Sequence, residues 1–204
     1  LSLIGSVLGL IGGFVFLYVP SLSKQLSEYS ISFAAGILLT VSLIGLMPEA
    51  VHTLDKPAFM IVLLGFLVAF FFEHFCHLHH HHQECEARNS NSLIIFGDTI
   101  HNFIDGVSIA AAYLISPNLG LILALSTFLH ELPHEIGDFG VLLNSGWEKR
   151  KVLVTNFLSS LSTIIGALLT FYLIPNSNLT GTLIAIAAGI FLYLGASDFL
   201  PQIT

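Results

Sequence analysis

Charged residues are scarce in this chain of 204 residues: it has 6 Lys and Arg and 13 Asp and Glu, which is 9% of the total. A soluble domain carries about 25% charged residues, so these charges are too few to cover a soluble surface. Hydrophobic residues make up 54% of the chain. This excludes intrinsic disorder, which requires low hydrophobicity and high net charge. The composition therefore predicts an integral membrane protein.

Basic residues and cysteines are also rare. The formal net charge is −7 and the sequence contains no basic stripe, so we expect no nucleic-acid partner. The 2 cysteines cannot build a disulfide framework. The partners that remain are the lipid bilayer and whatever the polar residues inside it bind.

Long apolar stretches fill most of the sequence. A bilayer core of about 30 Å requires roughly 20 apolar residues in each helix. Proline, glycine, asparagine and serine mark turns between the stretches. Because the chain begins inside an apolar run and stops just after another, we expect further residues beyond its ends. The prediction is an all-α polytopic helix bundle, a single transmembrane domain over 1–204, with seven spans at 1–20, 31–51, 57–75, 92–115, 119–145, 151–174 and 178–200.

The few basic residues predict the orientation in the membrane. With the N-terminus outside, five of the six fall on one side of the membrane and Lys56 alone falls on the other. Cytoplasmic loops carry the excess of lysine and arginine. We therefore expect a plasma or inner membrane protein with its N-terminus outside and with loops 21–30, 76–91 and 146–151 in the cytoplasm.

Polar residues interrupt the fourth and fifth predicted spans. Ionisable groups inside a membrane span are costly and are functional candidates by default. The sequence reads HNFID at 101–105 and HELPHE at 130–135. A predicted turn at Pro117–Asn118 lies midway between the two motifs. An antiparallel hairpin would therefore bring both motifs to the same depth, near the middle of the bilayer.

The polar residues of each motif share one helix face at about 100° per residue. If the two faces meet, they form a histidine-rich metal position and a second position rich in asparagine and glutamate, with Asp105 placed to bridge them. Imidazole and carboxylate ligands suit Zn²⁺ and also Fe²⁺ or Mn²⁺. We count Cd²⁺ as a further candidate for the bound ion. The first position would take His101, Asp105, His130 and His134. The second would take Asn102, Asp105, Glu131 and Glu135.

Other interpretations of these residues remain open. A single membrane histidine or aspartate often serves only an interhelical hydrogen bond, and two histidines can bind haem, although adjacent carboxylates disfavour a haem pocket. HELPH also matches the H-E-x-x-H pattern of zinc proteases, in which Glu131 would be the general base. A catalytic zinc has three protein ligands and one water, whereas this site offers donors for two ions. We therefore expect no enzyme.

A histidine-rich segment joins the third and fourth predicted spans, within and beside the loop 76–91. It holds six of the ten histidines and both cysteines, and cytosolic thiols stay reduced. Such a tract is typical of a flexible metal-binding segment; the alternatives are a solvated polar loop or an inserted tag. The candidate ligands are His74, Cys76, His77, His79, His80, His81, His82 and Cys85.

The two motifs resemble those of the ZIP (Zrt/Irt-like) divalent metal transporters, in the branch whose fifth helix reads HExPHE. The resemblance rests on HNFIDG at 101–106 and HELPHEIGDFGVLLNSG at 130–146, with support from MPEA at 47–50 and from the segment 191–201. It extends over essentially the whole chain. It implies transport of zinc or a related cation into the cytosol, with the metal as cargo and no cofactor.

The resemblance also implies an architecture. ZIP proteins have eight spans with both termini outside, so the eighth would lie beyond Thr204. We expect a homodimer in which spans 1, 4, 5 and 6 move like an elevator against the others. The chain departs from the family pattern at Gly45, where this branch often has histidine, and at Gln202, where glutamate is common. The runner-up is a cation-diffusion exporter, which also uses H-x-x-x-D but usually has six spans.

Overall fold

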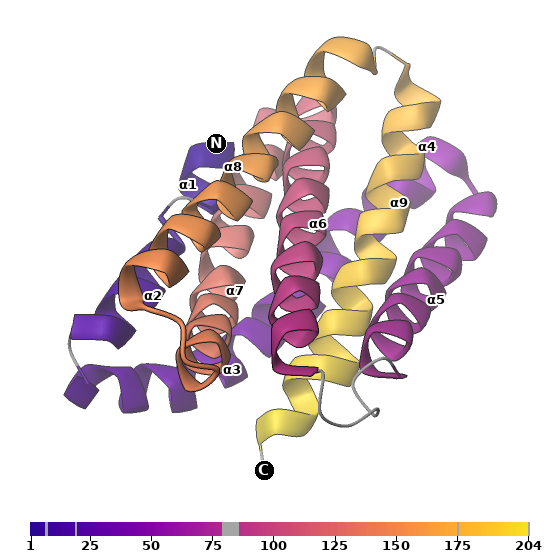
Figure 1. Ribbon diagram of the computed structural model, residues 1–204. Coiled ribbons are helices and arrows are strands. Elements are labelled where there is room, and N and C mark those ends of the chain that lie inside the picture. The colour runs from indigo at the N-terminus through magenta and orange to yellow at the C-terminus, as the bar shows by residue number, and fades with distance from the viewer. Residues whose placement is uncertain (7, 19, 79–85, 175, 204) are drawn as a thin grey trace.

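The computed structural model describes residues 1–6, 8–18, 20–78, 86–174 and 176–203, and these residues form helices and short connections without any strand (Figure 1). The all-α helix bundle is therefore confirmed. The longer helices are α2 (Leu10–Tyr18), α3 (Pro20–Thr40), α4 (Met47–Leu54), α5 (Pro57–Leu78), α6 (Glu86–Ile115), α7 (Pro117–Asn144), α8 (Lys149–Leu173) and α9 (Ser177–Tyr193). The shorter elements are α1 (Ser2–Gly5), the π-helical turns η1 (Val41–Leu46) and η3 (Leu194–Phe199), and the 3₁₀ turn η4 (Leu200–Ile203).

Local sequence signals explain where the helices begin and end. Proline is the first residue of α5 and α7, a position at which its missing N–H costs nothing. The side chain of Asn176 caps α9 by accepting a hydrogen bond from the backbone N–H of Asn178 at 2.9 Å. Gly146 has a φ of +84° just after α7, a conformation that glycine adopts without strain.

Within the described residues, four helical segments are long and apolar enough to cross a membrane: Ile31–Leu54, Pro57–His74, Lys149–Leu173 and Ser177–Ser197. Helices α6 and α7 are as long, with 30 and 28 residues, but they carry the polar motifs. The predicted first span, 1–20, is divided into α1 and α2. The number of seven spans stays a prediction.

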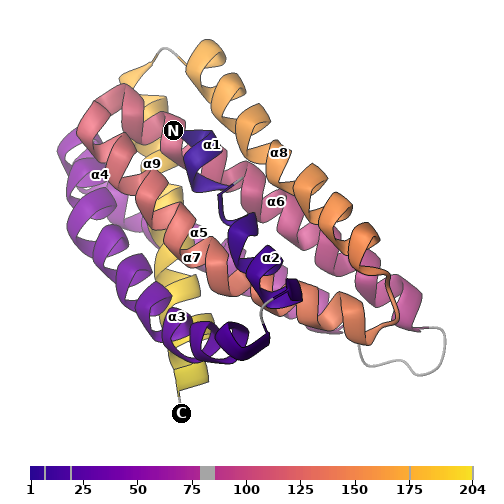
Figure 2. The ribbon, with the colours of Figure 1, turned by 90° about the vertical axis from the view of Figure 1, so that its left-hand side faces the viewer.

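The helices pack in two closely associated pairs, α6 with α8 and α5 with α9. In the first pair, a Cβ atom at Gly106 would collide with the carbonyl of Thr163, and one at Gly166 would collide with the carbonyl of Phe103. Small residues let membrane helices approach to backbone distance in this way. Helix α7 completes the arrangement, because it lies beside α6 and also contacts α1, α2 and α3 (Figure 2).

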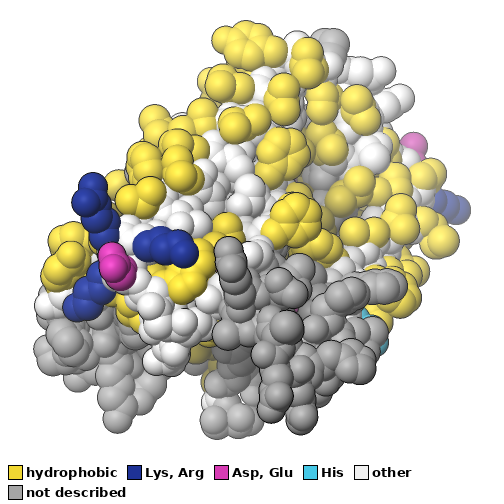
Figure 3. All heavy atoms as spheres, viewed as in Figure 1, with side chains coloured by type: hydrophobic (Ala, Val, Ile, Leu, Met, Phe, Trp, Pro, Cys, Tyr) yellow, Lys and Arg dark blue, Asp and Glu magenta, His cyan; other side chains and the backbone are white. Residues whose placement is uncertain are grey.

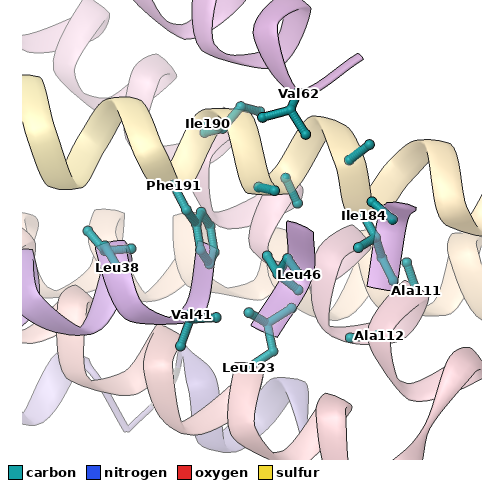
Figure 4. Close-up of a cluster of buried hydrophobic side chains, with 14 of the residues drawn as sticks. Leu38, Val41, Leu46, Val62, Ala111, Ala112, Leu123, Ile184, Ile190 and Phe191 are labelled. Atoms are coloured by element: carbon teal, nitrogen blue, oxygen red, sulfur yellow. The ribbon is translucent and has the colours of Figure 1, made fainter. Parts of the chain in front are cut away.

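The apolar core lies between α9, α3 with η1, α4 and the hairpin of α6 and α7. Figure 4 shows Phe191 extending from α9 toward the segment that carries Leu38 and Val41. Phe191 is fully buried. Many other large apolar side chains are exposed, and hydrophobic atoms cover much of the described surface in Figure 3. An exterior of this kind suits lipid rather than water.

Candidate metal centre

The hairpin of α6 and α7 brings two histidines and two carboxylates together. His101 and Asp105 lie one turn apart on α6, and His130 and Glu131 are adjacent on α7. The Nε2 atom of His101 lies 3.2 Å from Oε1 of Glu131 and 3.2 Å from Nε2 of His130. The Nε2 atom of His130 lies 3.2 Å from Oδ2 of Asp105. We call these four residues the histidine–carboxylate cluster.

The spacing of the cluster fits a tetrahedral metal ion. One ligand atom from each residue lies within 4.8 Å of the other three. Zinc binds nitrogen and oxygen at roughly 2.0–2.2 Å, which separates tetrahedral ligands by about 3.3 Å. Three of the measured separations are 3.2 Å, and two more are 3.8 Å and 3.9 Å. Five of the six separations between the ligand atoms therefore lie close to the tetrahedral value, and the sixth, between Asp105 and Glu131, is within 4.8 Å.

The cluster is almost completely buried. Asp105, His130 and Glu131 have no more than 1% of their side-chain surface exposed, whereas His101 has 14%. His101 is therefore the member of the cluster nearest to solvent. The other three lie where water cannot compete for an ion and where charges interact strongly.

Neighbouring groups orient the cluster. The Nδ1 atom of His130 lies 3.0 Å from the backbone carbonyl of Ser126; since a carbonyl only accepts, Nδ1 carries the proton and Nε2 presents its lone pair to the cluster. The ring of Phe191 meets the His130 ring edge-on at 5.5 Å. From the other side, a Cβ atom at Gly9 would lie 2.8 Å from Cβ of Glu131. Glycine at this position thus lets the segment between α1 and α2 approach Glu131.

His134 lies beside the cluster. Its ring stacks on that of His101, with centroids 4.9 Å apart and an interplanar angle of 25°. On the other side it meets Phe199 of η3 at 5.4 Å. His134 is partly buried. That it is a ligand stays a prediction.

Asn102 is hydrogen-bonded to protein on both sides of its amide. Its Nδ2 atom donates to Oδ1 of Asp98 at 2.8 Å and to the Asp98 carbonyl at 3.1 Å. Its Oδ1 atom accepts from the Thr163 hydroxyl of α8 at 3.0 Å. Asn102 thereby links α6 to α8 and positions Asp98, a residue that the sequence analysis did not select.

The structure brings part of the predicted second metal position into the cluster. Asp105 and Glu131 belong to the histidine–carboxylate cluster, and Glu135, which does not, interacts electrostatically with Asp98, Glu131 and Asp138. Glu135 is 2% exposed, and neither of its carboxylate oxygens has a hydrogen-bond partner. The second position as predicted from the sequence remains untested.

The histidine-rich segment lies mostly outside the described residues. His74 is exposed on α5 and its ring stacks on Phe70, with centroids 5.8 Å apart. Cys76 and His77 fall within α5, but the structure does not describe their side chains. His79, His80, His81, His82 and Cys85 lie outside the described residues. Metal binding by this segment stays a prediction.

Comparison with known proteins identifies the family. The family model of the ZIP zinc transporters matches residues 1–93 and 80–204. The zinc transporter ZIP10 of Mus musculus is 40% identical over 128 residues, which cover 62% of this chain and 15% of the relative. The zinc transporter ZIP4 of Homo sapiens is 38% identical over 116 residues, which cover 57% of this chain and 18% of the relative. The metal cation symporter ZIP8 of Rattus norvegicus is 40% identical over 111 residues, which cover 54% of this chain and 24% of the relative. The matched part thus spans less than a quarter of each relative, but the family model extends over the whole chain, which belongs to the ZIP zinc transporter family.

Proposed function

We propose that this protein carries zinc or a related divalent transition-metal cation across a membrane and into the cytosol. The observation that carries the proposal is the buried histidine–carboxylate cluster, whose spacing matches the ligand separations of a tetrahedral ion. Membership of the ZIP family supports the same conclusion. Two of the relatives are named zinc transporters and the third a metal cation symporter.

The charges of the cluster suit a doubly charged cargo. Two ionised carboxylates, Asp105 and Glu131, balance one divalent cation, and the two imidazoles bind it as neutral ligands. The occupied cluster would therefore be neutral. A buried net charge is expensive at membrane depth, so this balance favours Zn²⁺, with Fe²⁺, Mn²⁺ and Cd²⁺ as related cargoes, over monovalent ions. His134 is a further candidate ligand because its ring stacks on His101.

The packing of the helices supports an elevator-like movement. Helices α6 and α8 meet at backbone distance, and α7 lies beside α6. On the other side, α5 and α9 also meet at backbone distance, at Gly65 and Gly189. We propose that the group of α1, α2, α6, α7 and α8 moves as one body and carries the ion past the group of α3, α4, α5 and α9. A homodimer and an eighth span belong to this proposal.

Removal of the α7 histidines tests the function. The double variant His130→Ala/His134→Ala should lose zinc uptake, measured with radioactive zinc in reconstituted vesicles, because the remaining donors cannot complete the coordination. The protein should remain folded, as judged by size-exclusion chromatography.

The variant His52→Ala, at an exposed position of α4, is the control and should transport normally. Unchanged uptake in the double variant would refute the assignment of the cluster as the transport site.

A further inference from the structure

Basic and aromatic residues gather where α7 passes into α8. The segment WEKRK at 147–151 holds three of the chain's 6 Lys and Arg residues beside its single tryptophan. Lys149, Arg150 and Lys151 are all exposed, and Figure 3 shows Lys and Arg side chains clustered at the end of the bundle where α8 begins. The histidine–carboxylate cluster uses none of these residues. This concentration of positive charge, in a chain with a formal net charge of −7, marks a surface that suits an anion.

Trp147 is held in place by the body of the protein. Its backbone N–H donates to the Leu142 carbonyl at 3.1 Å. Its side chain is partly buried and packs against a small apolar cluster that includes Leu142 and Val152. The ammonium of Lys151 lies over the ring, with Nζ 3.5 Å from the ring centroid. The tryptophan thus has a fixed position and carries a lysine on its face.

Lys149 connects the start of α8 to the end of α2. Its Nζ donates to the Leu17 carbonyl at 3.3 Å and lies 5.7 Å from the centroid of the Tyr18 ring. An ammonium has three N–H donors, and this bond uses one of them. Tyr18 is itself 56% exposed. We call this surface region the basic–aromatic patch; it consists of Tyr18, Trp147, Lys149, Arg150 and Lys151.

The start of α8 also lacks the residues that usually balance a helix N-terminus. That end of a helix is electropositive and favours acidic side chains, yet the first turn of α8 has no acidic residue and instead contains the three basic ones. Glu148 occupies the N-cap position, but its side chain makes no capping hydrogen bond. The backbone and the side chains therefore add positive potential at the same place, which an anion from outside the chain would balance.

The surface next to the patch has the form of a lipid-binding strip. Lys149 begins one of the segments that are long and apolar enough to span a membrane, so the patch lies at the edge of a span. Val154 and Leu158 follow Arg150 at intervals of four residues and share its helix face. Their side chains are 50% and 61% exposed. A positive region with an apolar strip directly below it matches the two parts of a phospholipid.

We propose that the basic–aromatic patch binds the headgroup of an anionic phospholipid, whose acyl chains lie along Val154 and Leu158. The planar guanidinium of Arg150 suits the phosphate oxygens, and lysines near a membrane surface attract anionic lipids. Tryptophan and tyrosine favour the same headgroup level of the membrane. A free anion would contact the positive groups alone, whereas a lipid also covers the apolar strip. Binding of the lipid does not rest on the proposed function.

Fluorescence of Trp147 tests the proposal, because it is the single tryptophan of the chain and lies within the patch. Bromine on a lipid quenches tryptophan on contact. The purified protein is reconstituted in phosphatidylcholine vesicles that contain increasing fractions of brominated phosphatidylglycerol or of brominated phosphatidylcholine. One basic residue near the surface contributes roughly fivefold in affinity for anionic lipid. The wild type should therefore prefer the anionic lipid by at least about fivefold, and Arg150→Gln/Lys151→Gln should lower this preference toward one.

The single variants Arg150→Gln and Lys56→Gln form a matched pair, since each removes one positive charge at an exposed position. Arg150→Gln should reduce the preference for phosphatidylglycerol, and Lys56→Gln should leave it unchanged. Arg150→Gln also carries the test if the double variant does not fold. Inorganic phosphate in the buffer should not relieve the quenching; relief would show a site for free anions and overturn the lipid assignment.

Equal quenching of the wild type by the two brominated lipids would refute the lipid site. The proposed function is tested separately, because the quenching is measured without zinc. The variant His130→Ala/His134→Ala should lose zinc uptake and keep the lipid preference. A wild type that transports zinc without preferring phosphatidylglycerol would leave the proposed function standing and the lipid site refuted.

Discussion

At the scale of single residues, the surroundings of His130 and Glu131 decide what the cluster does. The Ser126 carbonyl accepts a hydrogen bond from Nδ1 of His130, which leaves Nε2, 3.2 Å from Oδ2 of Asp105, available to a cation between the two atoms. Glu131 holds its Oε1 at 3.2 Å from Nε2 of His101 and 3.9 Å from Nε2 of His130. Under the proposed function, a carboxylate this close to both imidazoles would share an ion with them.

This placement predicts the effect of Glu131→Gln. If Glu131 is a ligand, the neutral amide should weaken Zn²⁺ binding by about tenfold or more, which is at least 1.4 kcal/mol. If Glu131 were the general base of a protease, the change would leave Zn²⁺ binding intact and abolish peptide cleavage. Isothermal titration of the purified protein with Zn²⁺ separates the two, with the exposed Glu148→Gln as the control. Cleavage of a membrane-spanning peptide by the wild type would overturn the transporter assignment.

Histidine ligands also predict competition between protons and metal. Free histidine has a pKa of about 6.5, and an imidazole must be deprotonated to bind a metal ion. Lowering the pH from about 7.5 to about 5.5 crosses this range and should therefore weaken Zn²⁺ binding at the cluster. Titrations at both pH values measure the effect, which should be smaller in His101→Ala because one competing imidazole is gone. Equal wild-type affinity at the two values would be incompatible with histidine ligation.

At the scale of elements, close helix contact holds the site together. Thr163 of α8 donates to Asn102 on α6, and this bond requires the two helices to approach at Gly106 and Gly166. Helix α7 contributes in another way, because it continues from Pro117 to Asn144 through Pro133. The proline occupies the turn between His130 and His134 without ending the helix, so both histidines stay on one face.

Gly106→Ala tests the importance of the contact between α6 and α8. The added Cβ would lie 2.7 Å from the carbonyl carbon of Thr163, so the helices must separate. Overpacking of this kind costs about 1–3 kcal/mol, and the melting temperature should fall. Gly36→Ala is the matched control: its Cβ would meet nothing within 4 Å, so the melting temperature should stay the same or rise. A Gly106→Ala variant as stable as Gly36→Ala would contradict this account of the packing.

At the scale of the whole molecule, the sequence predicted contacts within the hairpin better than contacts between distant helices. One turn near Pro117 determines which residues of α6 and α7 face each other, so the meeting of His101 with His130 was predictable. The position of Asp98 beside Asn102 could also have been predicted, since Asp98 lies one helical turn before Asn102. Thr163 was not, because its bond to Asn102 spans 61 residues and no local pattern encodes it. The predicted first span is divided into α1 and α2, and both pack against α7, a contact between distant segments that no local pattern encodes.

The orientation of the whole molecule gives the last prediction. Lys56 lies between α4 and α5, and Arg150 lies in the first turn of α8. Figure 1 shows the connection of α4 to α5 and the start of α8 on opposite sides of the bundle. The excess of lysine and arginine predicts that Arg150 faces the cytoplasm and Lys56 the outside. In a background with Cys76 and Cys85 replaced by serine, Lys56→Cys should react with a membrane-impermeant maleimide in intact cells, and Arg150→Cys only after permeabilisation. The reverse pattern would place the loops 21–30, 76–91 and 146–151 outside and would refute the predicted orientation.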